Sequence, residues 1–211
     1  QYGVLLILDE VMCGMGRTGK LFACEHDGIS PDICTIAKGL GAGYQPIGAT
    51  LCSETIFDAI AQGSGFFQHG HTYIGHPVAC AAALAVVKKL TSGLVDGVPA
   101  KGDALQNMLR DTLGQNPIVG DVRGRGLFIG VEFVAGRATK TCLDPALKFH
   151  ARLKKEAFAQ GLICYPMGGT IDGVNGHHIL LAPAFIFQPD HVDELVEKLT
   201  RTLNEVSTTW Q

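Results

Sequence analysis

LLILDEVMCGMGRTG, residues 5–19, is an apolar run that ends in two acidic residues and then a glycine-rich turn. Gly14, Gly16 and Gly19 have the spacing G-x-G-x-x-G, which in dinucleotide-binding proteins directly follows a strand and opens a helix. Here four residues separate Asp9 from Gly14, and the segment after Gly19 has no long apolar repeat of 3.6 residues. The dinucleotide fingerprint also has an acidic residue about 20 residues after the glycines begin, and this chain has Cys34 there. The glycines therefore predict a loop after a buried strand, not a dinucleotide site.

Length and composition restrict the class of protein. The chain of 211 residues is 46% hydrophobic, enough for one large domain or two small ones. A formal net charge of −3 without a basic stripe argues against a nucleic-acid or membrane partner. No segment has 18 uninterrupted apolar residues, so no membrane-spanning helix is expected. Seven cysteines without a C-x-x-C pair favour reduced thiols in a soluble intracellular protein, cytoplasmic or organellar.

The first residues predict that more polypeptide precedes them. The sequence enters its apolar run at Val4, with neither an initiator methionine nor room for a targeting segment. A strand this apolar should be central in a parallel sheet and covered on both faces, so its neighbours must come from elsewhere. We therefore expect the sequence to be the later part of a longer chain.

Hydrophobic periodicity and turn residues predict the tail of an α/β fold followed by a small α+β domain. Domain boundaries are expected at 1–99 and 100–211. In the first domain we expect buried strands at 4–9, 33–37 and 46–52, a helix after Ser53 through Gln62, a long loop at 63–76 and a helix from Pro77 to Leu90. In the second we expect helices at 100–113, 146–160 and 189–206, and strands within 119–133, 162–167 and 177–185.

Two side chains of opposite charge follow the first two predicted strands. Asp9 ends the first strand and Lys38 is expected to end the second, and ligands of open α/β sheets gather at the carboxyl ends of strands. A structural ion pair is one interpretation. The other is chemical: a desolvated lysine on a turn rich in glycine is a nucleophile toward aldehydes, and an acid can keep a pyridine nitrogen protonated.

Three segments in order resemble one family: DEVMCGMGRTG, TIAKGLGAGYQPIGA and HGHTYIGHPVACAAALA. They are similar to the class III aminotransferases, fold-type I enzymes that depend on pyridoxal 5′-phosphate (PLP), and within them to the ω-amine and β-alanine:pyruvate-like group. VRGRGLFIGVEF and HHILLAPAF extend the resemblance through the second domain. It implies that residues 1–99 belong to the PLP-binding large domain with its mostly parallel central sheet, and that the sequence is the C-terminal half of the family's length.

The resemblance also implies roles for individual residues. Asp9 would pair with the pyridinium nitrogen of PLP, and Lys38 would form the internal aldimine and move the proton. Val11, two residues from Asp9 and so on the same side of an extended chain, would pack on one face of the ring. Thr72 would reach the cofactor phosphate of the partner subunit, which implies a homodimer with shared active sites. The substrates would be an amine donor and a keto-acid or aldehyde acceptor.

Other residues have a structural interpretation of equal or greater weight. Arg17 could touch a carboxylate but is expected to brace the loop. His69, His71 and His76 lie in one loop without an acid or cysteine at ligand spacing, so no metal site is expected. Arg123 and Arg125 could bind substrate or could be structural residues at a strand edge. Phe66 and Phe67 could line the substrate entrance or could belong to the core.

The match departs from the family in the substrate region. Many ω-aminotransferases have a mobile arginine between the last two strands, but residues 164–185 contain none. His177 stands where the family usually has aspartate, and Ala184 where a second proline is common. The glycine–serine turn for the phosphate and the aromatic residue that stacks on the ring lie outside this sequence. Transamination is the leading prediction; the alternatives are another PLP carbanion reaction (aminomutase, racemase or decarboxylase) and an inactive fragment or assembly partner.

Overall fold

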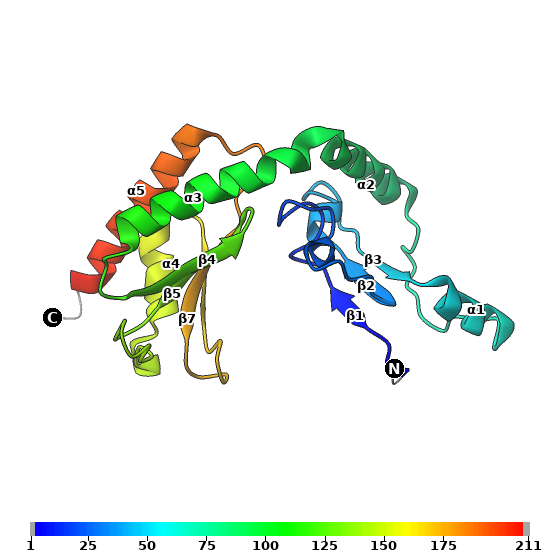
Figure 1. The fold of residues 1–211 in the computed structure, drawn as a ribbon, viewed down its shortest axis with the longest axis horizontal. Helices are drawn as coiled ribbons and strands as arrows, with labels where there is room; N and C mark the ends of the chain where they lie inside the picture. The colour runs from blue at the N-terminus through cyan, green and yellow to red at the C-terminus, as the bar shows by residue number, and fades with distance from the viewer. Residues whose placement is uncertain (1–2, 209–211) are drawn as a thin grey trace. The chain divides into compact units, whose positions relative to one another are not determined.

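The computed structural model describes residues 3–208, and the chain divides into two compact units, Gln1–Val98 and Pro99–Gln211 (Figure 1). We call them the N-terminal unit and the C-terminal unit. The order of helices and strands along the chain is the one that the sequence predicts.

The N-terminal unit contains a three-stranded sheet in the order β1-β2-β3, formed by β1 (Ile7–Asp9), β2 (Ile33–Ile36) and β3 (Ala49–Cys52). β1 and β2 are parallel, and Asp9 lies opposite Thr35. β2 and β3 are antiparallel. Because β1 and β2 run in the same direction, their carboxyl ends meet at one edge of the sheet.

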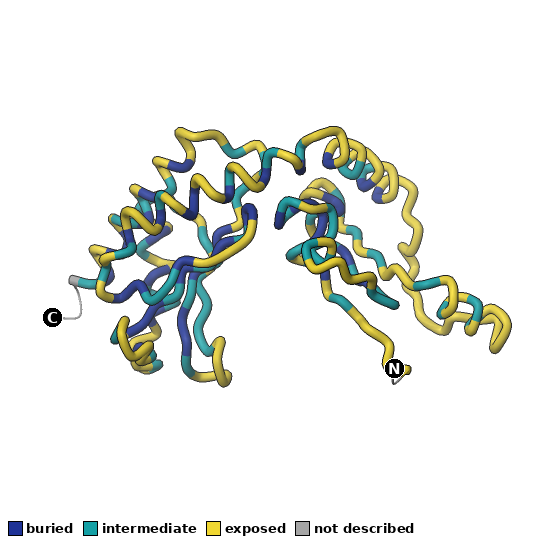
Figure 2. The backbone as a smooth tube through the Cα atoms, in the orientation of Figure 1, coloured by how far each residue is buried: buried dark blue, intermediate teal, exposed yellow. Residues whose placement is uncertain are grey.

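The first strand differs from the prediction in length and in burial. Residues 4–9 were expected to form a buried central strand, but β1 has only three residues, and Val4 and Ile7 are 84% and 61% exposed. Within residues 3–208, β2 pairs with one side of β1 and no strand pairs with the other. The hydrophobicity of the segment is that of a covered strand, but the described residues supply no layer to cover it (Figure 2).

The helices of this unit confirm the predicted boundaries. α1 (Glu54–Gln62) follows Ser53, whose hydroxyl makes no capping hydrogen bond, and α2 (Pro77–Lys89) begins at Pro77. The segment between them has no helix or strand. At the start of α2, Nδ1 of His76 accepts a hydrogen bond from the backbone N–H of Ala79 over 3.4 Å.

By length and composition alone, the helical run Pro77–Leu113 is apolar enough to cross a membrane. It is not one continuous helix, because η3 (Leu90–Leu94) and η4 (Val95–Gly97) interrupt it, and Gly93 has a φ of 107°. This break leaves α2 with 13 residues, fewer than the about 20 that a bilayer requires. The run is therefore two helices joined at a turn.

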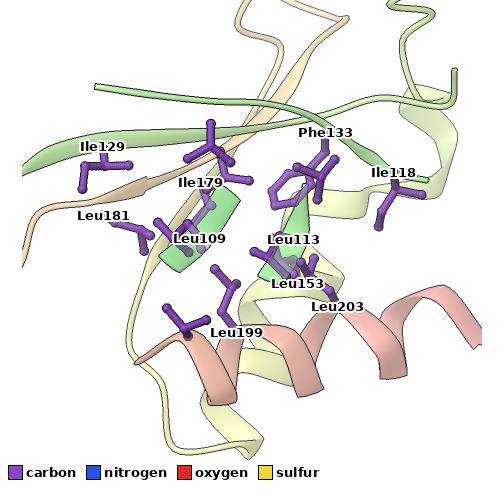
Figure 3. Packing of buried hydrophobic residues seen from close by; sticks show 14 of the residues in the cluster. Leu109, Leu113, Ile118, Ile129, Phe133, Leu153, Ile179, Leu181, Leu199 and Leu203 are labelled. Carbon is purple, nitrogen blue, oxygen red and sulfur yellow. The ribbon is translucent and has the colours of Figure 1, made fainter. Parts of the chain in front are cut away.

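The C-terminal unit has an antiparallel sheet in the order β4-β5-β7-β6. Its strands are β4 (Val119–Arg125), β5 (Phe128–Phe133), β6 (Tyr165–Gly168) and β7 (His177–Leu181), and its helices are α3 (Val98–Leu113), α4 (Phe149–Ala159) and α5 (Pro189–Thr208). Leucines on α3 and α5 meet the inward side chains of the strands, as Figure 3 shows. Full burial of one such leucine stabilises the fold by about 1.5–3 kcal/mol.

The helix predicted at 146–160 begins later than expected. Residues Pro145–Leu147 form a separate 3-10 turn, η5, and Lys148 has a left-handed φ of 48° before α4 starts at Phe149. The Asp144 side chain accepts a hydrogen bond from the backbone N–H of Ala146 and holds this turn apart from α4. The predicted stop is confirmed: Gly161 follows α4 with a φ of 75°.

Candidate active site

Asp9 is the last residue of β1, as predicted, and its side chain lies at the exposed carboxyl end of the strand. Its Oδ1 atom accepts a hydrogen bond from the backbone N–H of Val11 over 2.9 Å. The chain therefore turns at Val11, and the prediction that these residues share one side of an extended chain is wrong. The cause is local, since an aspartate readily accepts a hydrogen bond from the backbone two residues further on.

Glu10 is the residue that sequence reasoning missed. Its side chain is buried, with 2% of the residue exposed, and its carboxylate accepts hydrogen bonds from the backbone N–H groups of Ala23 (2.7 Å) and Cys24 (2.8 Å). Those partners lie in the 3-10 helix η1 (Ala23–His26). The sequence did contain a signal for this. Successive side chains of a strand point to opposite faces, so two adjacent acids at a strand end cannot both face the same surface.

The glycine-rich segment is a series of turns, which confirms the predicted loop. A Cβ atom at Gly14 would lie 2.6 Å from the Glu10 carbonyl oxygen, so only glycine fits there. Gly16 and Gly19 have φ values of 88° and 92°, which glycine adopts without strain. Arg17 lies half-buried in this loop, and burial lowers the pKa of its guanidinium.

Lys38 lies at the neighbouring strand end but not where the sequence placed it. β2 ends at Ile36, and Lys38 begins the short 3-10 helix η2 (Lys38–Leu40) with a φ of 43°. Its side chain is exposed, so this chain does not supply the desolvation expected for a nucleophilic lysine. Lys38 is exposed for the same reason as β1: the described residues provide no layer that covers this edge of the sheet.

One close approach brings the two strand-end turns together. A Cβ atom at Gly39 would lie 2.8 Å from the Cβ atom of Met15, so η2 packs against the glycine-rich loop. The backbone N–H of Glu10 also donates to the Thr35 carbonyl over 2.9 Å. Asp9 and Lys38 are thus presented by adjacent parallel strands whose following turns pack on each other. A carboxylate and a primary amine therefore lie at the same edge of the sheet.

The loop between α1 and α2 carries the other predicted site residues. Thr72 is exposed in a turn four residues before His76, and no hydrogen bond joins it to Asp9 or Lys38 in the described part of the chain. Phe66 and Phe67 are 66% and 63% exposed. In this chain the aromatic pair is therefore not part of a core.

The three histidines of this loop have no arrangement typical of a metal site. His69, His71 and His76 are exposed, and His76 has a structural role at the start of α2. Among residues 3–208, no group of three or more His, Cys, Asp or Glu side chains is placed to hold a metal ion. All seven cysteines are free.

The arginines of the C-terminal unit include one with clear structural contacts. Arg123 donates from Nη1 to Asp121 (3.0 Å) and to Glu132 (3.2 Å), and the hydrogen bond to Asp121 is the main cause that raises its pKa. Lys140 adds a contact to Glu132 at 3.6 Å. This network supports the structural interpretation of Arg123. Arg125 ends β4 and is exposed.

The two residues that depart from the family pattern, His177 in β7 and Ala184 after it, lie in different surroundings. His177 is buried with 3% of the residue exposed, and its ring packs against those of Phe149 and His150. Ala184 lines a hollow of about 420 Å³ together with Leu162, Phe187 and Lys198. Lys198 hydrogen-bonds to Glu194 and to a backbone carbonyl, so its ammonium is already paired.

Comparison with known proteins identifies the family. The family model for class-III aminotransferases matches residues 1–203. An uncharacterized aminotransferase of Schizosaccharomyces pombe is 45% identical over 204 residues, which are 96% of this chain and 44% of the relative. The uncharacterized aminotransferase YodT of Bacillus subtilis is 41% identical, with 97% of this chain and 46% of the relative covered.

Solved structures give the same result. An (S)-enantioselective ω-transaminase from Thermomicrobium roseum matches with a TM-score of 0.88 and 38% identity, over 97% of this chain and 44% of that one. An amine transaminase from an uncultivated Pseudomonas species, in its PLP-bound internal aldimine form, matches with a TM-score of 0.85 and 37% identity, over 97% of this chain and 45% of that one.

These matches define both the fold and its extent. The chain has the mixed α/β structure of PLP-dependent transaminases of fold type I. It spans less than half the length of the relatives that it matches. With the family model covering 203 of 211 residues, the chain belongs to the class-III aminotransferases, a family of PLP-dependent enzymes.

Proposed function

We propose that this chain supplies Asp9 and Lys38 to the active site of a PLP-dependent aminotransferase. The enzyme would move an amino group from an amine or amino acid to a keto acid or aldehyde. One observation carries the proposal: the two residues lie at the carboxyl ends of adjacent parallel strands, and the turns next to them pack together where Gly39 meets Met15. The family match supports the reaction class.

Asp9 has the chemistry to hold a ring proton. Oδ1 accepts the Val11 N–H, and Oδ2 has no hydrogen bond among the described residues, so one carboxylate oxygen is available to a donor. When bound, PLP supplies an electron sink for a carbanion, provided that its pyridine nitrogen stays protonated. Asp9 would hold that proton at its free oxygen.

Lys38 would carry out the covalent and proton-transfer steps. Its Nζ atom is the primary amine that would hold the aldehyde group of PLP. The same amine, once freed, would accept a proton and return it. Lys38 has a left-handed backbone conformation and is the first residue of η2, so its side chain extends from this turn and not from the strand.

The other assignments are part of the same proposal. Val11 would pack on one ring face, and Thr72 would contact the phosphate bound by a partner subunit, in a homodimer with shared sites. Residues 1–99 would belong to the PLP-binding domain and 100–211 to the small domain. The exposure of Thr72 supports contact with a group outside this chain.

A graft tests the reaction. The chain replaces the matching part of the ω-transaminase from Thermomicrobium roseum, with which it aligns over 97% of its length. We expect the graft to convert added PLP to pyridoxamine 5′-phosphate when an amine is supplied, measured by mass spectrometry. A folded, PLP-loaded graft that racemises or decarboxylates the substrate without forming pyridoxamine 5′-phosphate would contradict the proposal.

A further inference from the structure

Glu10 joins three segments that surround Asp9. Its backbone N–H donates to Thr35 of β2 over 2.9 Å, and its carbonyl accepts from Gly14 of the glycine-rich loop over 2.9 Å. Its carboxylate accepts from Ala23 and Cys24 of η1. The end of β1, the next strand, the loop and η1 are therefore tied at one residue.

The carboxylate of Glu10 is buried, which makes these bonds strong constraints. A buried carboxylate is costly unless it is fully hydrogen-bonded, and bonds from N–H groups to a charged oxygen are shorter and stronger than neutral ones. The Cys13 thiol lies 3.5 Å from Oε2. Burial and the neighbouring Glu10 charge raise the pKa of that thiol to about 11, so it stays protonated as a donor.

The consequence falls on Asp9, which precedes Glu10, and on Val11, which follows it. The hydrogen bond from Val11 to Oδ1 fixes the rotation of the Asp9 carboxylate. That bond requires the turn at Val11, and Glu10 holds both ends of the turn in place. A shift of Glu10 would displace its two neighbours, which are the donor and the acceptor of the Asp9–Val11 hydrogen bond, and would weaken that bond.

We infer that Glu10 is a positioning residue, which fixes the orientation of the Asp9 carboxylate through its bonds to Ala23 and Cys24. Its significance for PLP rests on the proposed function, in which Asp9 meets the ring nitrogen. Glu10 itself is buried, with 2% of the residue exposed, and would act through Asp9.

Hydrogen exchange of the chain without PLP tests the inference directly. In Glu10→Gln one carboxylate oxygen becomes an NH₂ group, which cannot accept from a backbone N–H. We expect the amides of Ala23, Cys24 and Val11 to exchange about tenfold faster or more, since bonds to charged groups are the stronger class. Amides of α3 in the C-terminal unit serve as the internal reference.

Glu25→Gln is the matched control. Glu25 also accepts a backbone N–H, from Phe22 over 2.7 Å, but it is exposed and belongs to η1 itself. We expect it to leave the Val11 amide unchanged. If Glu10→Gln also leaves the Val11 amide unchanged while Ala23 and Cys24 exchange faster, Glu10 holds η1 only and the inference is wrong.

A spectroscopic measurement distinguishes positioning from general stability. In the PLP-loaded graft, the pH midpoint of the cofactor absorbance should shift in Glu10→Gln in the same direction as in Asp9→Asn. A merely structural role would lower PLP occupancy without moving that midpoint, and this result would overturn the inference. Failure of the unsubstituted graft to bind PLP would count against the proposed function, and the exchange experiment would still decide the role of Glu10.

Discussion

The imidazole rings of His150 and His177 lie nearly parallel inside the C-terminal unit, with centroids 5.6 Å apart and an interplanar angle of 18°. Nδ1 of His150 and both ring nitrogens of His177 are buried without a hydrogen-bond partner among the described residues. Burial, and then the neighbouring His150, lower the pKa of His177 below its ordinary value of 6.5. The buried position therefore favours the neutral form of His177.

This geometry predicts a loss of stability in acid. Well above pH 6.5 His177 is neutral in both the folded and the unfolded chain, and its contribution to stability is fully present. As the pH falls below 6.5, the unfolded chain binds a proton that the folded chain does not, so the free energy of unfolding decreases. Each tenfold difference in proton affinity contributes about 1.4 kcal/mol. Urea unfolding at pH 7.5 and 5 measures the effect.

His177→Phe should remove most of this acid sensitivity, because it replaces the unpaired ring nitrogens with carbon. His71→Gln is the control, since His71 is an exposed histidine in a loop of the N-terminal unit. Equal acid sensitivity in His177→Phe and the unsubstituted chain would show that another group is responsible.

Gly102→Ala should destabilise the C-terminal unit. A Cβ atom at Gly102 would lie 2.1 Å from the carbonyl oxygen of Gly126, at the turn between β4 and β5, so α3 would have to move away from the hairpin. Overpacking of this kind costs about 1–3 kcal/mol. Gly97→Ala is the control, because nothing lies within 4 Å of a Cβ atom there. Thermal unfolding should separate the two variants, and equal midpoints would contradict this packing.

Ile7→Lys should reduce self-association of the isolated chain. Ile7 is 61% exposed on β1, whose second edge has no partner within residues 3–208, and such apolar edges favour pairing between chains. Sedimentation velocity across a range of concentrations measures the effect. Ile171→Lys is the control, because Ile171 is 67% exposed but lies outside any strand. If both variants reduce association equally, the β1 edge is not the cause.

Asp9→Asn should weaken PLP binding without unfolding the N-terminal unit. An asparagine oxygen can still accept the Val11 N–H, but the side chain no longer carries the charge that holds a ring proton. Loss of a charged hydrogen bond corresponds to roughly 10- to 150-fold weaker binding. PLP titration of the graft, with the exposed Asp27→Asn as control, measures the difference. Equal affinity in both variants would exclude Asp9 as the ring-nitrogen partner.

Local signals in the sequence predicted most of the fold. Pro77 marked the start of α2, Gly161 the end of α4, and the spacing around Gly14 a loop and not a helix. These features depend on backbone restrictions within a few residues. Alternation of apolar residues likewise located the strands of the C-terminal unit, whose core lies within this chain.

Burial at the candidate site was not predictable in the same way. The apolar run before Asp9 has the composition of a covered strand, and the structure leaves Val4 to Ile7 exposed. The apolar composition indicates that this segment is suited to a buried position, but the described residues do not include the chain that would cover it. The turn at Val11 and the shift of Lys38 beyond β2 depend on individual hydrogen bonds, which periodicity does not encode.

Covalent capture of PLP on Lys38 tests the central claim most directly. The graft with the Thermomicrobium roseum ω-transaminase is incubated with PLP, reduced with borohydride and mapped by peptide mass spectrometry, beside its Lys38→Ala and Lys148→Ala variants. Lys148 is the matched control, since it is also exposed and has a φ of 48° against 43° for Lys38. The account predicts a pyridoxyl adduct on Lys38 that Lys38→Ala abolishes and Lys148→Ala retains. Labelling of both lysines to the same extent, or no adduct on Lys38 in a folded graft, would contradict it.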